Sequence, residues 1–130
     1  MNRENSHQEI KDTSNIIEEI TGQKPNYFGP VGGNYNQSVI NISKNNGLQT
    51  ILWSWDQDPK DWSGKNYPAI IRHVVHNLSP GDIILFHDSG GDRTKTIKAL
   101  PYIFEHLKEN GYKSITVSEM IKLNTKHDFE

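Results

Sequence analysis

Short apolar runs alternate with longer amphipathic segments along the whole chain, and this order limits the folds that it can adopt. A helix is predicted from about Ser6 to Thr21, and four pairs of a strand and a helix follow it. Strands that alternate with helices of this length form a parallel sheet covered by helices. The sequence therefore predicts an α/β fold, with residues 1–123 as part of one domain and residues 124–130 as a frayed tail.

Capping and turn residues set the expected ends of these elements. Ser6 and Glu9 have the spacing of a capping box, which predicts that the first helix begins there. Asn36 and Pro68 suit the first turns of two later helices, and Gly47 suits the position just after a helix. The predicted strands cover or end at residues 27–28, 50–53, 82–86 and 113–117, and the helices that follow them cover residues 36–46, 67–77, 94–110 and 118–123.

Composition and charge exclude several classes of protein. The net charge of −2 provides no basic excess for nucleic acid, and the absence of cysteine excludes disulfides and thiolate metal sites. No apolar run approaches the ~18 residues of a membrane span. The N-terminal segment lacks the apolar core of a signal peptide, and the compartment is left open. The hydrophobic share of 33% is low for a self-contained core, so we expect part of the core to be missing.

Polar and ionisable residues follow the ends of the predicted strands, where ligands bind in parallel α/β folds. They are Asn34, residues 56–62 and residues 87–92. His87 is the sharpest candidate, because it ends the most apolar predicted strand and Asp88 follows it. An imidazole with its usual pKa near ~6.5 suits general acid–base catalysis. A histidine that is hydrogen-bonded inside a turn explains the position equally well.

Aspartates and tryptophans alternate in the loop after the second predicted strand. Carboxylates beside indole rings are common in sugar sites, where the sugar stacks on the indole and its hydroxyl groups bond to the carboxylates. Closely spaced aspartates also suit a hard cation, and a solvated turn beside core tryptophans is a third interpretation. The residues concerned are Asp56, Asp58 and Asp61, with Trp53, Trp55 and Trp62.

Two further patterns favour structural explanations. His73 and His76 have the spacing that places both imidazoles on one helical face, as in a metal pair, but no third ligand lies beside them. A surface helix is the favoured interpretation. The glycines Gly29, Gly32 and Gly33 lack the lysine of a phosphate-binding loop, so they indicate a tight turn.

Taken together, the segments resemble the polysaccharide deacetylases, the NodB-homology domain of carbohydrate esterase family 4. The resemblance implies a distorted (β/α) barrel and hydrolysis of the N-acetyl amide of N-acetylglucosamine units in peptidoglycan or chitin. It also implies a divalent metal, usually zinc, held in the family by an aspartate and two histidines. The segments that carry the resemblance are residues 20–25, 58–62, 81–88, 90–94, 111–112 and 116–119.

The resemblance assigns roles to individual residues of this chain. His87 matches the general acid of the family's Leu-x-His motif, and Asp61 matches the carboxylate that orients it. Leu85 and Trp62 match the walls of the pocket for the acetyl methyl group.

Two further residues are predicted to contact the substrate. In the resemblance Gly32 stands where the family has a tyrosine, and the role implied for its backbone N–H, donation to the oxyanion, needs no side chain. Asp58, in the loop before Asp61, is the other predicted substrate-binding residue.

The chain departs from the family pattern at two places. Gly29 stands where the family has the arginine that braces the catalytic base. The family's Asp-Asp and His-x-x-x-His metal motifs are absent, so we expect no metal ligands in this chain. The resemblance thus implies a partial barrel that lacks the N-terminal strands and holds the acid half of the site without the metal half.

Three functional hypotheses follow from these departures. The first is the C-terminal part of a deacetylase that is inactive alone, and the second is a non-catalytic glycan-binding domain that uses Trp55, Trp62 and the aspartate loop. The third is a non-functional remnant. An open sheet edge also predicts self-association and poor solubility.

Overall fold

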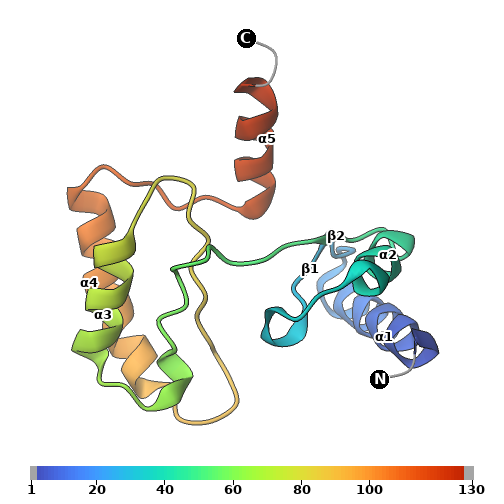
Figure 1. Cartoon of the computed structure of the whole chain (residues 1–130), viewed down its shortest axis with the longest axis horizontal. Helices are drawn as coiled ribbons and strands as arrows, with labels where there is room; N and C mark the ends of the chain where they lie inside the picture. Colours follow the sequence, from blue (N-terminus) through green and yellow to red (C-terminus); the bar gives the residue numbers. More distant parts are fainter. Residues whose placement is uncertain (1–2, 128–130) are drawn as a thin grey trace. The chain divides into compact units, whose positions relative to one another are not determined.

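A computed structural model of the protein describes residues 3–127 of the backbone and the side chains of residues 5–124. The chain divides into two compact units, Met1–Leu52 and Trp53–Glu130. In the described part the elements, labelled in Figure 1, are α1 (Arg3–Thr21), β1 (Tyr27–Phe28), the 3-10 turn η1 (Val31–Gly33), α2 (Gln37–Asn45), β2 (Gln49–Thr50), the 3-10 turn η2 (Asp61–Ser63), α3 (Tyr67–Asn77), α4 (Thr94–Glu109) and α5 (Val117–His127). None of the helices in this part is long and apolar enough to cross a membrane.

The first unit contains two short parallel strands and two helices. β1 pairs with β2 in the register Tyr27 to Gln49 and Phe28 to Thr50. α1 contacts α2, and α2 contacts β2. The α/β class with parallel strands is therefore confirmed, although the sheet of the described residues is small.

The second helix of this unit begins and ends where the sequence predicted. The side chain of Asn36 accepts a hydrogen bond from the Val39 N–H at 3.0 Å, so it caps α2. Gly47 follows the helix with a φ of 75°, a left-handed conformation that glycine adopts without steric cost.

The predicted start of the first helix was wrong. α1 begins at Arg3, so Ser6 lies inside the helix and does not cap it. No glycine or proline precedes Ser6, and therefore nothing in the local sequence stops the helix from extending toward the N-terminus.

The core of the second unit lies between α3 and α4, which run side by side in Figure 1. Ile70 and Val74 of α3 are buried against Ala99 and Ile103 of α4. The predicted helices over residues 67–77 and 94–110 are confirmed. The side chain of Asn66 caps α3 by accepting a hydrogen bond from the Ala69 N–H at 3.0 Å.

The predicted strand over residues 82–86 is an extended segment without a regular ladder. Ile83 O accepts from the Ser54 N–H at 2.9 Å, and the Leu85 N–H donates to Gln57 O at 3.0 Å. A turn between Ser54 and Gln57 separates these two hydrogen bonds and interrupts the register. The segment is nevertheless anchored, because Ile84 and Phe86 pack on the core of α3 and α4. Successive side chains alternate in extended backbone, so Leu85 and His87 are placed on the other side.

Two other predicted strands were also wrong in extent. The strand predicted over residues 50–53 is limited to β2. Residues 113–117 form no strand, and within the described part no backbone hydrogen bond joins residues 113–115 to a neighbouring segment. Alternating apolar residues allow a strand, but a strand forms only where a partner completes the ladder.

The last helix is longer than predicted at both ends. The Thr116 N–H donates to Glu119 Oε2 at 2.8 Å and the Glu119 N–H donates to Thr116 Oγ1 at 3.2 Å, which is a capping box. α5 therefore begins at Val117 rather than Ser118, and it runs past Leu123 to His127. Of the tail predicted over residues 124–130, residues 128–130 lie outside the described part.

Candidate active site

The second unit brings together the two residues predicted to be catalytic. His87 Nδ1 lies 2.8 Å from Asp61 Oδ1, and the backbone N–H of His87 donates to Asp61 Oδ2 at 3.0 Å. The Asp61 side chain is fully buried, whereas the His87 side chain is 37% exposed. One carboxylate therefore holds both the backbone and the ring of a histidine that still reaches the surface.

A third residue completes this arrangement, and the sequence analysis missed it. Thr96 Oγ1 donates to Asp61 Oδ2 at 2.8 Å, and Thr96 is only 3% exposed. Thr96 lies in the first turn of α4, three and seven residues before the buried Ala99 and Ile103. A hydroxyl on an otherwise apolar helical stripe was the signal that could have identified it.

The surroundings of Asp61 act on its ionisation in opposite directions. Burial by itself raises the pKa of Asp61, because it disfavours the charged form. The backbone N–H and ring of His87 and the hydroxyl of Thr96 lower it, and the pKa ends below its ordinary value. Asp61 is therefore a carboxylate at neutral pH.

This ionisation state determines how His87 can act. A carboxylate on Nδ1 selects the tautomer with a proton on that nitrogen and fixes the orientation of the ring. The other ring nitrogen, Nε2, is then the one that can exchange a proton with a ligand. The geometry fits a general acid or base that works at the surface of the unit.

The backbone before Asp61 turns sharply. Asp58 Oδ1 accepts from the Lys60 N–H at 3.0 Å, and Lys60 has a left-handed conformation with a φ of 51°. This conformation is costly for a residue with a side chain, and the structure around it must maintain it. The turn places Asp61 at the start of η2, pointing into the protein, with Trp62 next to it and 56% exposed.

The remaining predicted substrate residues are distributed over both units. Leu85 is half-buried, and it is joined to the loop before Asp61 through Gln57 O. Asp58 stabilises the turn with one carboxylate oxygen, and its role toward a substrate stays a prediction. Gly32 belongs to the other unit, where it lies in η1 with a φ of 62°, so its role at the oxyanion also stays a prediction.

The structure also shows which contacts the other candidate histidines and aspartates make. His73 Nε2 lies 2.9 Å from the backbone oxygen of Asp56, and His76 is exposed, so the structural explanation of this pair is favoured. Asp61 is buried and contacts His87 and Thr96, whereas Asp56 is exposed, and the three aspartates form no cluster suited to a cation. No group of three histidine, aspartate or glutamate side chains suited to a metal occurs within the described residues. The family's metal does not fit this set of side chains.

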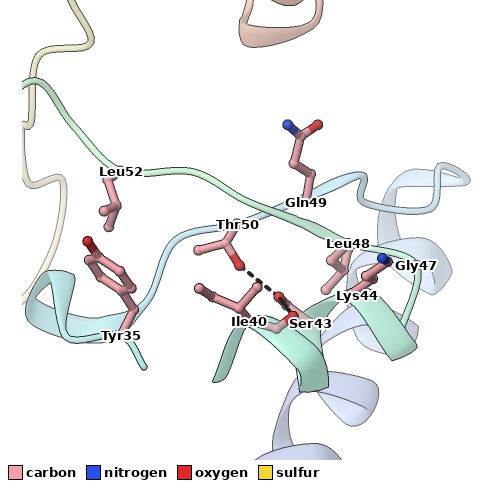
Figure 2. Close-up of a pocket in the computed structure, with 9 residues that line it drawn as sticks. All are labelled: Tyr35, Ile40, Ser43, Lys44, Gly47, Leu48, Gln49, Thr50 and Leu52. Carbon is pink, nitrogen blue, oxygen red and sulfur yellow. Dashed lines mark hydrogen bonds between the residues drawn. The ribbon is translucent and has the colours of Figure 1, made fainter. Parts of the chain in front are cut away.

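A hollow of about 670 Å³ lies elsewhere, in the first unit. Figure 2 shows its lining residues around α2 and β2. Ser43 and Thr50 share a hydrogen bond of 2.7 Å there. Lys44 is the charged residue among its lining residues, which are Tyr35, Ile40, Ser43, Lys44, Gly47, Leu48, Gln49, Thr50 and Leu52. The hollow contains no acid–base pair and none of the predicted site residues.

Comparison with known proteins identifies the family. The family model described as polysaccharide deacetylase matches residues 1–51. The chain is 46% identical over 100 residues to a peptidoglycan-N-acetylglucosamine deacetylase of Bacillus cereus, covering 77% of this chain and 47% of that protein. It is 34% identical over 112 residues to the peptidoglycan-N-acetylmuramic acid deacetylase PdaC of Bacillus subtilis, covering 86% of this chain and 22% of that protein. The chain thus spans less than half the length of these two relatives.

Solved structures agree with this assignment. The structure of PdaC from Bacillus subtilis matches with a TM-score of 0.85 at 26% identity, covering 98% of this chain and 59% of that chain. A carbohydrate esterase family 4 pseudoenzyme from Bacillus anthracis matches with a TM-score of 0.83 at 28% identity, covering 92% of this chain and 41% of that chain. The chain therefore belongs to the polysaccharide deacetylases of carbohydrate esterase family 4 and represents part of their domain.

Proposed function

We propose that this chain carries the general-acid half of a glycan deacetylase site, with His87 as the acid. The observation that carries the proposal is the contact of His87 Nδ1 with the buried carboxylate of Asp61 at 2.8 Å. The proposed substrate is the N-acetyl amide of N-acetylglucosamine units in peptidoglycan or chitin. The relatives support it, because two of them are named as peptidoglycan deacetylases and another, from Azorhizobium caulinodans, as a chitooligosaccharide deacetylase.

Amide hydrolysis explains why such a pair is useful. The C–N bond breaks readily only when the leaving nitrogen receives a proton, and a protonated His87 supplies it from Nε2. Asp61 keeps the ring oriented for this transfer, and Thr96 keeps Asp61 in place. In the proposal Leu85 and Trp62 enclose the acetyl methyl group, Asp58 contacts the sugar, and the Gly32 N–H stabilises the oxyanion.

The polysaccharide deacetylases are in general metal-dependent, and a bound divalent metal would supply a Lewis acid for the amide and for the attacking water. We propose a divalent metal, zinc, for the complete site. The sequence of this chain contains neither of the family's metal motifs, and the described side chains offer no suitable cluster. The 130 residues are therefore expected to release no acetate by themselves.

The test is acetate release from an N-acetylglucosamine tetramer, measured with zinc present. The chain alone is compared with a fusion to the part of the Bacillus cereus relative that this chain does not cover. The fusion should release acetate, and His87→Ala should reduce the rate by about a hundredfold or more, as expected for the loss of a general acid. A fusion whose rate is unaffected by His87→Ala refutes the proposal, and so does acetate release by the chain alone.

A second candidate is a non-catalytic glycan-binding domain. Two exposed indoles favour it, since Trp55 is 98% exposed and Trp62 is 56% exposed in the loop beside Asp61. A structural relative of this chain, from Bacillus anthracis, is described as a pseudoenzyme of the family, which supports the non-catalytic part of this hypothesis. Under this hypothesis the fusion binds N-acetylated oligosaccharides without releasing acetate.

We also propose that the chain self-associates. β1 and β2 form a two-stranded sheet in the described part, and the outer edge of β2 can add a further strand. Sedimentation velocity should show dimers or larger species whose share rises with protein concentration. A monodisperse monomer with one sharp melting transition contradicts this expectation.

A further inference from the structure

Trp55 is the most exposed tryptophan of the chain, and its backbone lies in a tight turn. Its exposed fraction is 98%, and the turn is closed by the Gln57 N–H, which donates to Ser54 O at 3.0 Å. A single exposed apolar side chain is common on protein surfaces and indicates nothing by itself. The hydrogen bonds around this turn distinguish Trp55 from such a side chain.

The first side of the turn is joined to the segment that leads to His87. The Ser54 N–H donates to Ile83 O at 2.9 Å, and Ser54 Oγ accepts from the Ile83 N–H at 2.9 Å. Ser54 is therefore held by both its backbone and its side chain.

The second side of the turn is joined to α3. His73 Nε2 lies 2.9 Å from Asp56 O, immediately after Trp55. Gln57 is completely buried, and its Nε2 donates to Val74 O at 3.2 Å and to Asp82 Oδ2 at 3.1 Å. The residues on both sides of Trp55 are thus immobilised, while the indole itself extends into solvent.

The same segments carry the acid–base pair. The Leu85 N–H donates to Gln57 O at 3.0 Å, two residues before His87, and Asp61 lies four residues after Gln57. Two residues of extended chain span about 7 Å. The turn of Trp55 is therefore hydrogen-bonded to the backbone segment that ends at His87, and both belong to one connected part of the unit.

We propose that Trp55 is a stacking platform for a second sugar ring of the glycan whose acetyl group is removed at His87. The apolar face of a pyranose ring packs on an indole, and the exposed Asp56 beside it can accept hydrogen bonds from sugar hydroxyl groups. Because the turn is already rigid, little conformational entropy is lost when the ring binds. The site consequently selects N-acetylated oligosaccharides over single sugars. This inference rests on the proposed function, since it concerns the same site.

The experiment follows the three indole N–H signals of the chain by ¹⁵N NMR during titration with N-acetylglucosamine and with its tetramer. Trp→Phe variants assign the signals to Trp53, Trp55 and Trp62. The tetramer should shift the Trp55 signal, and the monomer should leave it in place. Trp55→Ala should weaken tetramer binding about tenfold, which corresponds to ~1.4 kcal/mol, and should leave monomer binding unchanged.

A matched control is Phe104→Ala, which removes an aromatic ring that is 56% exposed on α4 of the same unit. It should not change tetramer affinity. The Trp53 signal reports whether each variant keeps its fold. The inference is overturned if the tetramer leaves the Trp55 signal unmoved up to millimolar concentration, or if Trp55→Ala binds it as tightly as the wild type.

The outcomes also separate this inference from the proposed function. His87→Ala should leave tetramer binding to the Trp55 platform intact, because the turn does not depend on the His87 ring. If Trp55→Ala weakens binding while the fusion keeps its activity without His87, the platform exists and the proposed acid is wrong. If His87→Ala abolishes acetate release while Trp55→Ala changes no affinity, the acid is supported and the platform is wrong.

Discussion

Replacing Thr96 by valine tests the buried part of the site with a minimal change of shape. Valine has nearly the same volume as threonine but has no hydroxyl to donate to Asp61 Oδ2, which now accepts from Thr96 at 2.8 Å. A hydrogen bond to a charged group contributes about 1.5–3 kcal/mol to stability. Oδ2 keeps its second donor, the His87 N–H. We therefore expect Thr96→Val to lower the free energy of unfolding by about 1.5–2 kcal/mol at pH 7, the low end of that range.

The effect should depend on pH in a defined direction. The pKa of Asp61 is lowered from its ordinary value of 3.8, so its ionisation stabilises the fold above that pH. This contribution is lost as the pH falls through the folded-state pKa. Thr96→Val removes one of the bonds that lower the pKa, so the variant should begin to lose stability at a higher pH than the wild type. Once Asp61 is protonated, the Thr96 bond becomes neutral and weaker, and the two proteins should converge.

The assay uses the position of the tryptophans. All three tryptophans of the chain lie in the unit Trp53–Glu130, so their fluorescence during urea unfolding reports on this unit alone. Thr96→Ser keeps the hydroxyl and should restore most of the loss. Thr94→Val is the matched control, because its hydroxyl bonds to the exposed Asp92 and should matter less. A loss in Thr96→Val no larger than in Thr94→Val, or one that does not shrink as the pH falls through the folded-state pKa of Asp61, refutes the reasoning.

Three further changes test other parts of the structure. Lys60→Gly should keep the free energy of unfolding within about 1 kcal/mol of the wild type, whereas Lys60→Val should lower it by more, because a β-branched residue resists a positive φ; equal free energies for the two variants, from urea unfolding curves, contradict this. Asn36→Ala should destabilise α2 by about 1 kcal/mol, and Asn36→Asp should not. The loss should be visible in circular dichroism but not in tryptophan fluorescence. A change in fluorescence would contradict the assignment of α2 to the other unit. Glu119→Ala removes one half of the capping box of α5 and should lower the helical signal, while Leu123→Ala, at a 53% exposed position of the same helix, should not; equal signals would show that the cap is unimportant.

Local signals predicted the helices well. Asn36 and Pro68 are recognisable in the sequence because a cap or a first turn depends on residues three or four positions apart. The errors were also local. Ser6 and Glu9 have capping-box spacing inside α1, while the box that operates at α5 is formed by Thr116 and Glu119.

Strands were predicted less well for a physical reason. The apolar pattern of residues 82–86 shows which face is buried, and Ile84 and Phe86 do pack on the core. Whether the segment forms a strand depends on hydrogen bonds to distant residues. The turn at Trp55 interrupts those bonds, and no pattern within residues 82–86 could have shown it.

The features of the candidate site also divide into those that the sequence determines and those that depend on the fold. The sequence by itself determined the chemistry at the ends of the segments: a histidine after an apolar run, an aspartate in the Asp-Trp pair, and a glycine turn in the first unit. Only the tertiary structure decided that Asp61, His87 and Thr96 meet, that both Asp61 oxygens are occupied, and that Trp55 is held in place while it remains exposed. Residue types and spacing along the chain are local properties, whereas burial and hydrogen bonding between residues 26 and 35 positions apart arise only when the chain folds.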